Sequence, residues 1–301
     1  MQPSRWTKII SKEGNVRGVA IQATAITREL QAIHGLDAMS ARGLGEATIA
    51  ALLVASYCKN GERVNLNITG SKTFRQALVD AYPDGKVRGY IMRRDSHAGA
   101  TGPGFGNEGP WGDGLLAVLR TKSQERQQPY IGTVPLVTGH LAKDLTFYWH
   151  QSEQVPSAVG LVVRTTTDPK TGEVRVSHAG GFMVQALPGA SESELKAIES
   201  HIGELTSFAD EVGEDGDPLH LLSRIFQSST FMIIEQRNLA LECQCSRERV
   251  ERAILLTGRE ELEDMARGDG AEVKCDFCAE RYVFGPDEIR EFLKGHAGVK
   301  E

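Results

Sequence analysis

The sequence predicts an α+β fold: an N-terminal core of mixed helices and strands, a helical connector, and a small C-terminal module that carries most of the cysteines. Three observations lead to this prediction. Apolar and polar residues alternate around Val64, Leu66 and Ile68, which is the period of a half-buried strand. The run GLGEATIAALLVASY at 43–57 is apolar over most of its length, as in a buried helix. Four of the five cysteines lie at or after position 243.

Length and composition are those of a globular protein with more than one domain. The chain has 301 residues, 40% hydrophobic and 25% charged, enough to bury a sizeable core and append a smaller module. We expect an α+β core domain at 1–190, an amphipathic helical linker at 191–241 and a C-terminal module at 242–301. The 34 Lys and Arg residues against 40 Asp and Glu residues give a net charge of -6, so we expect no nucleic-acid partner.

No targeting or membrane segment is expected from the hydropathy pattern. The N-terminal stretch MQPSRWTKIISKEG lacks the apolar region of a signal peptide. The most apolar stretch, residues 47–57, is too short to span a bilayer, so we expect no membrane partner and a cytoplasmic location. Because the cytoplasm keeps thiols reduced, a cysteine cluster there indicates metal binding or catalysis and not a disulfide framework.

Residues 191–241 have the pattern of a connector that packs on another surface. Ser191 and Glu194 form a capping box at the start of a helix. Apolar residues then recur at helical spacing, namely Leu195, Ile198, Ile202, Leu205, Phe208 and Val212. GEDGDP at 213–218 interrupts the helix, and the following HLLSRIFQSSTFMIIE is more apolar than a free linker needs. We therefore expect a linker with one apolar, covered face.

Two further patterns concern the connections within the core. The echo of GNVRG at 14–18 and GKVRG at 85–89 predicts that two strands are entered through the same kind of turn. The stretch 97–114 is rich in Gly and Pro, which predicts a long hairpin connection and excludes a regular helix or strand there.

The C-terminal cysteines form two tight pairs. Cys243 and Cys245 make a C-x-C motif, Cys275 and Cys278 make a C-x-x-C motif, and 29 residues, 246–274, separate them. Each pair can supply two neighbouring vertices of a tetrahedron, so the spacing predicts one Zn²⁺ ion held by the four sulfurs. Unrelated buried thiols would not need to fall in pairs.

The rest of the module is predicted from caps and strand patterns. Ser246 can cap one helix, and Thr257 with Glu260 offers a capping box for a second. The strand-like segments AEVKC and RYVF flank the CDFC turn, and a last helix is expected from about Asp287 to Leu293. A module of this size has a marginal core by itself.

Spacing alone leaves two interpretations of the cysteine site open. In the first, the metal only holds the module together, as in a zinc ribbon. In the second, the site is a redox switch, because C-x-C places two thiolates so close that an oxidant can join them once one has become a sulfenate. Metal binding supplies about 10–16 kcal/mol of folding free energy in small zinc modules, so oxidation would unfold the module and release the apolar face of the linker.

A set of segments in this sequence carries a resemblance to one known family. In the tail these segments are CQCSRERV, EVKCDFC and RYVF; in the core they are GLGEATIAALL, PDGKVRGYI, PYIGTVPLV, WHQSEQVPSAVGLVV and AGGFMVQALPGA. Taken in chain order and over nearly the whole chain, these segments resemble the redox-regulated 33 kDa heat-shock proteins, the 33 kDa chaperonin family. The Gly-rich stretch 97–114 is longer than is usual for that family.

The resemblance implies an ATP-independent holdase chaperone and not an enzyme, so no catalytic residues are expected. It implies a reduced, zinc-bound form that is inactive. Oxidation, combined with mild unfolding by heat or bleach, would form the disulfides Cys243–Cys245 and Cys275–Cys278, release zinc and unfold the linker. The activated form would bind unfolding client proteins and form a homodimer.

Two other candidate sites are better explained as structural features. Cys58 ends the apolar run ALLVASY and is expected to be a buried or half-buried core thiol without a redox role. The segment TGSKT at 69–73 lacks the spacing of a phosphate-binding loop, because Ser71 intervenes between Gly70 and Lys72, and it predicts a turn.

The functional alternatives are a binding protein and an oxidoreductase. Arg247, Arg249 and Arg252 could touch phosphates, but they alternate with Glu248 and Glu251, which is typical of a solvated helix face. The alternative to the chaperone is therefore a constitutive structural-zinc protein whose tail binds nucleic acid or a protein partner. A dithiol oxidoreductase ranks last, because its C-x-x-C would adjoin a βαβ unit that the tail lacks.

Overall fold

The computed structural model of the chain describes residues 2–59, 61–94, 109–121, 129–205, 208–213, 216–227 and 229–296. Helices and strands alternate irregularly along the chain, which confirms the α+β class. The chain folds as two compact units, Met1–Glu242 and Cys243–Glu301. We call them the core unit and the cysteine unit and describe each by itself.

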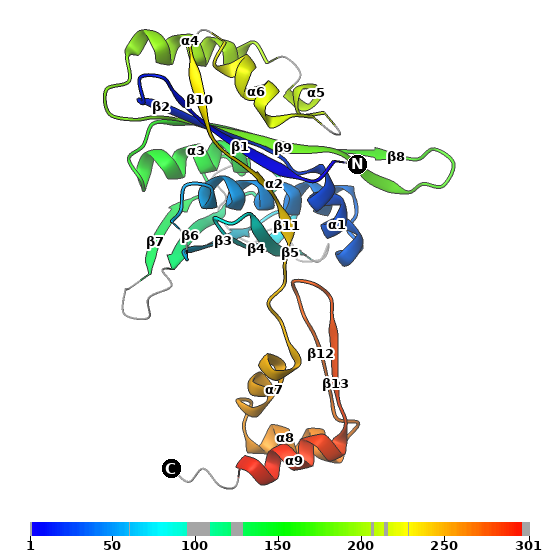
Figure 1. Ribbon diagram of the computed structural model, residues 1–301. Helices are drawn as coiled ribbons and strands as arrows, with labels where there is room; N and C mark the ends of the chain where they lie inside the picture. The colour runs from blue at the N-terminus through cyan, green and yellow to red at the C-terminus, as the bar shows by residue number, and fades with distance from the viewer. Residues whose placement is uncertain are drawn as a thin grey trace. The chain divides into compact units, whose positions relative to one another are not determined.

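Two sheets form the framework of the core unit (Figure 1). The five-stranded sheet has the order β10-β1-β2-β9-β8, with β1 (Arg5–Ser11), β2 (Val16–Gln22), β8 (Ser157–Thr167), β9 (Val174–Ala186) and β10 (Phe231–Asn238). The six-stranded sheet has the order β11-β5-β4-β3-β6-β7, with β3 (Arg63–Gly70), β4 (Phe74–Ala81), β5 (Lys86–Arg93), β6 (Gly114–Thr121), β7 (Tyr130–Pro135) and β11 (Ala240–Leu241). Neighbouring strands are antiparallel except β11 and β5, which are parallel.

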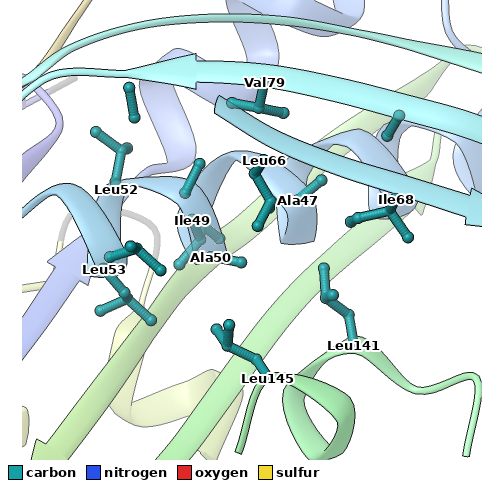
Figure 2. Close-up of a cluster of buried hydrophobic side chains, with 14 of the residues drawn as sticks. Ala47, Ile49, Ala50, Leu52, Leu53, Leu66, Ile68, Val79, Leu141 and Leu145 are labelled. Carbon is teal, nitrogen blue, oxygen red and sulfur yellow. The ribbon is translucent and has the colours of Figure 1, made fainter. Parts of the chain in front are cut away.

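Helix α2 (Ala38–Ala55) fills the space between the two sheets, with α1 (Thr24–His34) and α3 (Leu141–Gln151) beside it. Its apolar side chains meet those of the six-stranded sheet and of α3, as Figure 2 shows for Ile49, Leu66 and Leu145. The packing is close: a methyl group at Gly43 would lie 2.6 Å from a ring carbon of Phe74. A helix that is apolar on all sides is explained by burial on all sides.

The buried helix expected within 43–57 is present as α2, and it begins further back in the chain than the apolar stretch 47–57. Helix α2 is 18 residues long, not the 11 of residues 47–57, and by length and composition it could span a membrane. However, 78% of it is buried inside the protein, as befits the central helix of a core. The extra length begins at Asp37, whose carboxylate accepts a hydrogen bond from the N–H of Ser40 and caps the helix.

The first part of the linker is helical and covers the outer face of the five-stranded sheet (Figure 1). Its helices are α4 (Glu192–Gly203), α5 (Phe208–Val212) and α6 (Pro218–Ile225). The predicted cap is present, since Ser191 Oγ accepts a hydrogen bond from the N–H of Glu194 at 3.2 Å. We call the apolar sheet residues beneath these helices the covered face: Ile9, Val16, Ala20, Phe182 and Val184.

The prediction that the linker is helical was wrong for its last 11 residues, 231–241. Residues 231–238 form β10, an edge strand that pairs with β1, and 240–241 form β11 on the other sheet. Backbone hydrogen bonds connect this segment to both sheets. The Leu239 N–H donates to the Ser4 carbonyl at 2.8 Å, and the Ala240 N–H donates to the Gly85 carbonyl at 3.1 Å. An edge strand depends on a free partner strand, which the local sequence cannot reveal.

The two similar sequences, GNVRG and GKVRG, form similar turns as expected, and the strands that follow them belong to different sheets. Gly14 precedes β2 with φ of 76°, and Gly85 precedes β5 with φ of 86°. The prediction of a hairpin connection at 97–114 was wrong. This stretch joins β5 to β6, which are not neighbours in the sheet, because β4 and β3 lie between them. Within that stretch, residues 97–108 lie outside the described residues.

The cysteine unit contains three helices and one hairpin among its described residues: α7 (Arg247–Leu255), α8 (Arg259–Arg267), β12 (Ala271–Lys274), β13 (Arg281–Phe284) and α9 (Pro286–His296). Ser246 caps α7 as predicted, its hydroxyl accepting from the N–H of Arg249 at 3.3 Å. The capping box predicted at Thr257 and Glu260 is absent, because Gly258 occupies the cap position of α8 and Thr257 donates to the Ile254 carbonyl instead.

Replacing Gly85 by alanine should destabilise the core unit more than the matched replacement at Gly14. Both glycines have a positive φ, which costs an alanine about 1 kcal/mol. Only at Gly85 would the new methyl group lie 2.7 Å from another backbone atom, the Asn238 oxygen, whereas at Gly14 nothing lies within 4 Å. We expect Gly85→Ala to lower the free energy of unfolding by roughly 2–3 kcal/mol and Gly14→Ala by about 1 kcal/mol. Urea unfolding measures both changes in the free energy of unfolding. Equal losses for the two variants would mean that the contact between Asn238 and this turn does not restrict the side chain at position 85.

Glu46 on α2 should make stability depend on pH. Burial raises the pKa of its carboxyl to about 7 from an ordinary value of 4.5, against the opposing charge of Arg42. Because the pKa is higher in the folded state, the stabilisation is complete below about pH 4.5 and is lost as the pH rises through about 7.

Glu46→Gln should therefore raise the free energy of unfolding at pH 8 by on the order of 1–2 kcal/mol, with little effect at pH 4.5. Urea titrations at the two pH values measure this difference. Glu29→Gln, at an exposed position of α1, is the control for the loss of one carboxylate. A pH-independent effect of Glu46→Gln would contradict the assignment.

Candidate metal centre

The four C-terminal cysteines meet at one end of the β12–β13 hairpin. Cys275 and Cys278 lie in the turn of that hairpin, where Cys275 N–H donates to the Glu280 carbonyl at 2.8 Å and Ala279 N–H to the Cys275 carbonyl at 2.9 Å. Ala279 adopts a φ of 61°, which makes the turn tight. Cys243 and Cys245 lie just before the cap of α7. All four cysteines are half-buried.

The sulfur positions fit a single tetrahedral metal ion. All four Sγ atoms lie within 4.8 Å of one another. Sγ of Cys243 is 3.7 Å from Sγ of Cys275, and Sγ of Cys245 is 3.3 Å from Sγ of Cys278. A zinc ion bound at about 2.3 Å by four sulfurs would separate them by about 3.8 Å, whereas a disulfide requires about 2.05 Å. The cluster therefore could hold a metal, and it is the one such group among the described residues.

The electrostatics of the cluster favour a bound cation. Burial would raise the pKa of the Cys243 thiol, but hydrogen bonds from the backbone of Cys245 and from the neighbouring thiols lower it to about 7. Burial raises the pKa of Cys275 and Cys278, whose sulfurs also face the other cysteines. A thiolate is therefore readily formed at one corner, and further thiolates require a positive charge beside them. Four soft sulfur donors are the ligands that Zn²⁺ accepts in closed structural sites.

One further residue touches the cluster and was not found from the sequence. The Tyr282 hydroxyl donates a hydrogen bond to Sγ of Cys245 at 3.1 Å. The hydrogen bond to Cys245 raises the pKa of the Tyr282 hydroxyl, with desolvation as a smaller cause, so the hydroxyl stays protonated and acts as a donor. The only sequence signal is the position of Tyr282 in RYVF, four residues after Cys278.

Outside the cluster, Cys58 is a half-buried core thiol, as predicted. Its side chain is partly buried against the main core, and its Sγ lies 3.6 Å from the Val54 carbonyl. Burial raises the pKa of the Cys58 thiol to about 11, although Arg120 opposes this shift. A thiol that stays protonated near neutral pH is a poor nucleophile and a poor ligand.

The other sequence candidates are structural features. The segment at 69–73 is a turn between β3 and β4, in which the N–H groups of Ser71 and Thr73 donate to the carbonyls of Trp111 and Pro110. No helix follows it, so it cannot be a phosphate-binding loop.

Two of the three arginines of α7, Arg247 and Arg249, make contacts within the cysteine unit. The Arg247 guanidinium lies 2.6 Å from a Glu288 carboxylate oxygen and 4.3 Å from the centre of the Phe284 ring. Arg249 donates to the Gln244 carbonyl at 2.6 Å. These contacts give both residues a role in the fold of the module.

The chain is similar to known proteins over nearly its full length. The family model described as "Hsp33 protein" matches residues 4–285. A 33 kDa chaperonin of Geobacter sulfurreducens is 34% identical over 293 residues, covering 94% of this chain and 92% of the relative. A 33 kDa chaperonin of Streptococcus thermophilus is 33% identical over 288 residues, covering 95% and 98%. The crystal structure of a 33 kDa chaperonin (heat shock protein 33 homologue) of Thermotoga maritima matches with a TM-score of 0.85 at 29% identity, covering 99% of this chain and all of that one.

The double replacement Cys243→Ser with Cys245→Ser should abolish metal binding and unfold the cysteine unit. It removes two of four donors, and the described core of this unit has only five buried apolar side chains: Ile254, Leu262, Ala266, Phe284 and Ile289. Without the metal such a core does not overcome the chain entropy. Metal content after dialysis against Zn²⁺, with hydrogen exchange of residues 243–296, measures both effects. Cys58→Ser is the control and should keep one zinc per chain; full occupancy in the double variant would refute the site.

Proposed function

Because the chain belongs to the Hsp33 family, we propose that it is a redox-regulated, ATP-independent holdase chaperone. In the proposed resting state Cys243, Cys245, Cys275 and Cys278 bind one Zn²⁺ ion as thiolates, and the protein is inactive. In the active state these cysteines form the disulfides Cys243–Cys245 and Cys275–Cys278, zinc leaves and the linker unfolds. The observation that carries the proposal is the convergence of four sulfurs within 4.8 Å in a unit with a very small core.

Oxidation by a peroxide accounts for both the disulfides and the loss of metal. The lone pair of one thiolate attacks a peroxide oxygen, the O–O bond breaks and hydroxide leaves, which gives a sulfenic acid. The neighbouring thiolate then attacks this sulfur, a disulfide forms and a second hydroxide leaves. Two thiolates are oxidised by two electrons and one hydrogen peroxide is reduced. Disulfide sulfurs carry no charge to hold the cation, so zinc is released.

The path from the cluster to the linker runs along the chain itself. Glu242 directly precedes Cys243, and its N–H donates to the Val87 carbonyl at 3.0 Å while its carboxylate lies 2.8 Å from the Lys86 ammonium. Strand β11 pairs with β5 at Lys86 and Val87 over two residues only. Such a short pairing is weak, so freedom of the chain at Cys243 favours its detachment and then that of β10.

The client surface that this mechanism would release is the covered face together with the apolar sides of the linker helices. The linker contributes Ile198, Val212, Leu221, Leu222, Ile225 and Phe226 to the same cluster. Each large apolar side chain that is exposed costs about 1.5–3 kcal/mol, and this cost is offset when an unfolding client covers it again. We propose that the oxidised form acts in the cytoplasm on unfolding proteins and dimerises with a second copy.

The proposal predicts that zinc release and chaperone activity appear together. The zinc-loaded chain is treated with hydrogen peroxide at mild heat, and released zinc is followed with a colourimetric chelator. In parallel, suppression of the thermal aggregation of a model client is measured before and after oxidation. We expect about one zinc per chain to be released, suppression to appear with it, and reductant to reverse both.

Two controls separate this proposal from the constitutive structural-zinc protein. Cys58→Ser should behave as the parent chain, since its thiol lies outside the cluster. Binding of nucleic acid or client before oxidation, at the same affinity as afterwards, would favour the structural-zinc alternative. Zinc retention under peroxide, with all four thiols still free by alkylation, would refute the switch.

A further inference from the structure

The hydrogen bond from Tyr282 to Cys245 distinguishes this sulfur within the cluster. The hydroxyl oxygen lies 3.1 Å from Sγ of Cys245. Besides the thiols of the other cysteines, the groups that face Cys275 and Cys278 are backbone atoms of the hairpin turn itself, from Phe277, Cys278 and Glu280. Cys245 thus accepts a hydrogen bond from the Tyr282 hydroxyl, and a single conservative replacement can remove this hydroxyl.

Tyr282 is held in place by elements that do not depend on this hydrogen bond. It lies on β13 opposite Val273 of β12, and its ring packs against the small core of the cysteine unit. Phe284, two residues further along the same strand, is fully buried in that core. The ring is therefore anchored by the hairpin, and its hydroxyl is directed at the sulfur without ordering a flexible side chain.

We propose that Tyr282 is a positioning residue that sets the oxidant threshold of the switch by restraining the Cys245 thiolate. An O–H donor stabilises the negative charge on sulfur and occupies one of its lone pairs. In the reaction with peroxide a sulfur lone pair forms the new S–O bond while the O–O bond breaks and hydroxide leaves. The hydrogen bond must weaken as the charge leaves sulfur, so it stabilises the thiolate more than the transition state and slows oxidation.

The opposite role for the same hydroxyl makes a different prediction. If Tyr282 donated its proton to the departing hydroxide, it would speed oxidation, and its removal would slow the reaction. The observed donor contact is with sulfur, which favours the restraining role. The inference rests on the proposed redox function, since it concerns the rate at which that function is switched on.

The test compares the full-length, zinc-loaded chain with Tyr282→Phe, which keeps the ring and removes only the hydroxyl. Under a fixed excess of hydrogen peroxide, timed alkylation and mass spectrometry follow the free thiols of the peptides that carry Cys245 and Cys275. We expect oxidation at Cys245 to accelerate roughly three- to tenfold, and zinc release with it. Equal or slower oxidation at Cys245 in Tyr282→Phe would overturn the inference.

Further readouts separate this role from a merely structural one. Zinc affinity without oxidant, measured by chelator competition, and the thermal midpoint of the zinc-loaded chain should change little in Tyr282→Phe. In the Co²⁺-loaded protein the sulfur-to-metal charge-transfer band should shift, because one sulfur loses its hydrogen bond. Val283→Ala, at the neighbouring exposed position of β13, is the matched control and should leave both the rate and the band unchanged.

The same experiment distinguishes failure of this inference from failure of the proposed function. If the parent chain keeps its zinc and its thiols under peroxide, the redox function fails. If the parent chain is oxidised and Tyr282→Phe is oxidised at the same rate, only the role of Tyr282 fails.

Discussion

Four sulfurs confined within 4.8 Å of one another impose the constraint on which the cysteine unit depends. As thiolates they repel one another unless a cation lies between them, and as thiols they supply little packing or hydrogen bonding to replace it. The described core of the unit is too small to compensate, with five buried apolar side chains. Any reaction that removes the charge from these sulfurs therefore removes most of the free energy that folds the unit.

The core unit has the opposite balance. Helix α2 is buried between two sheets, and the main cluster of apolar residues includes side chains from both of them. The proposed switch requires this part to stay folded when the cysteine unit does not. The linker helices belong to a second, separate cluster on the outer face of the five-stranded sheet. Because the two clusters share no residue, the linker helices can detach without opening the main core, to which Leu239 at the end of the linker belongs.

The connection between stable and labile parts is a short one. Strand β11 contributes two residues to the six-stranded sheet, and β10 lies at the edge of the other sheet with Met232, Ile233 and Ile234 about half exposed. Edge strands with exposed apolar residues bind other chains readily. In the reduced form the backbone groups along one side of these strands are paired with β1 and β5. The pairing ends at Leu241, and Glu242, which precedes Cys243, adds a hydrogen bond to the Val87 carbonyl.

The sequence by itself determined the features that depend on neighbours in the chain: the α+β class, the strand at 64–68, the helix caps at Ser191 and Ser246, and the paired cysteines. Short-range periodicity, capping and ligand spacing are local properties, and the cysteine spacing together with family resemblance led to the candidate site. Tertiary structure decided the rest. The segment 231–241 became strand because β1 and β5 offered free edges, and Tyr282 reached Cys245 because the β12–β13 hairpin brings together residues 37 positions apart. Each of these outcomes depends on a partner distant in sequence, and a local pattern contains no information about which partner the fold will supply.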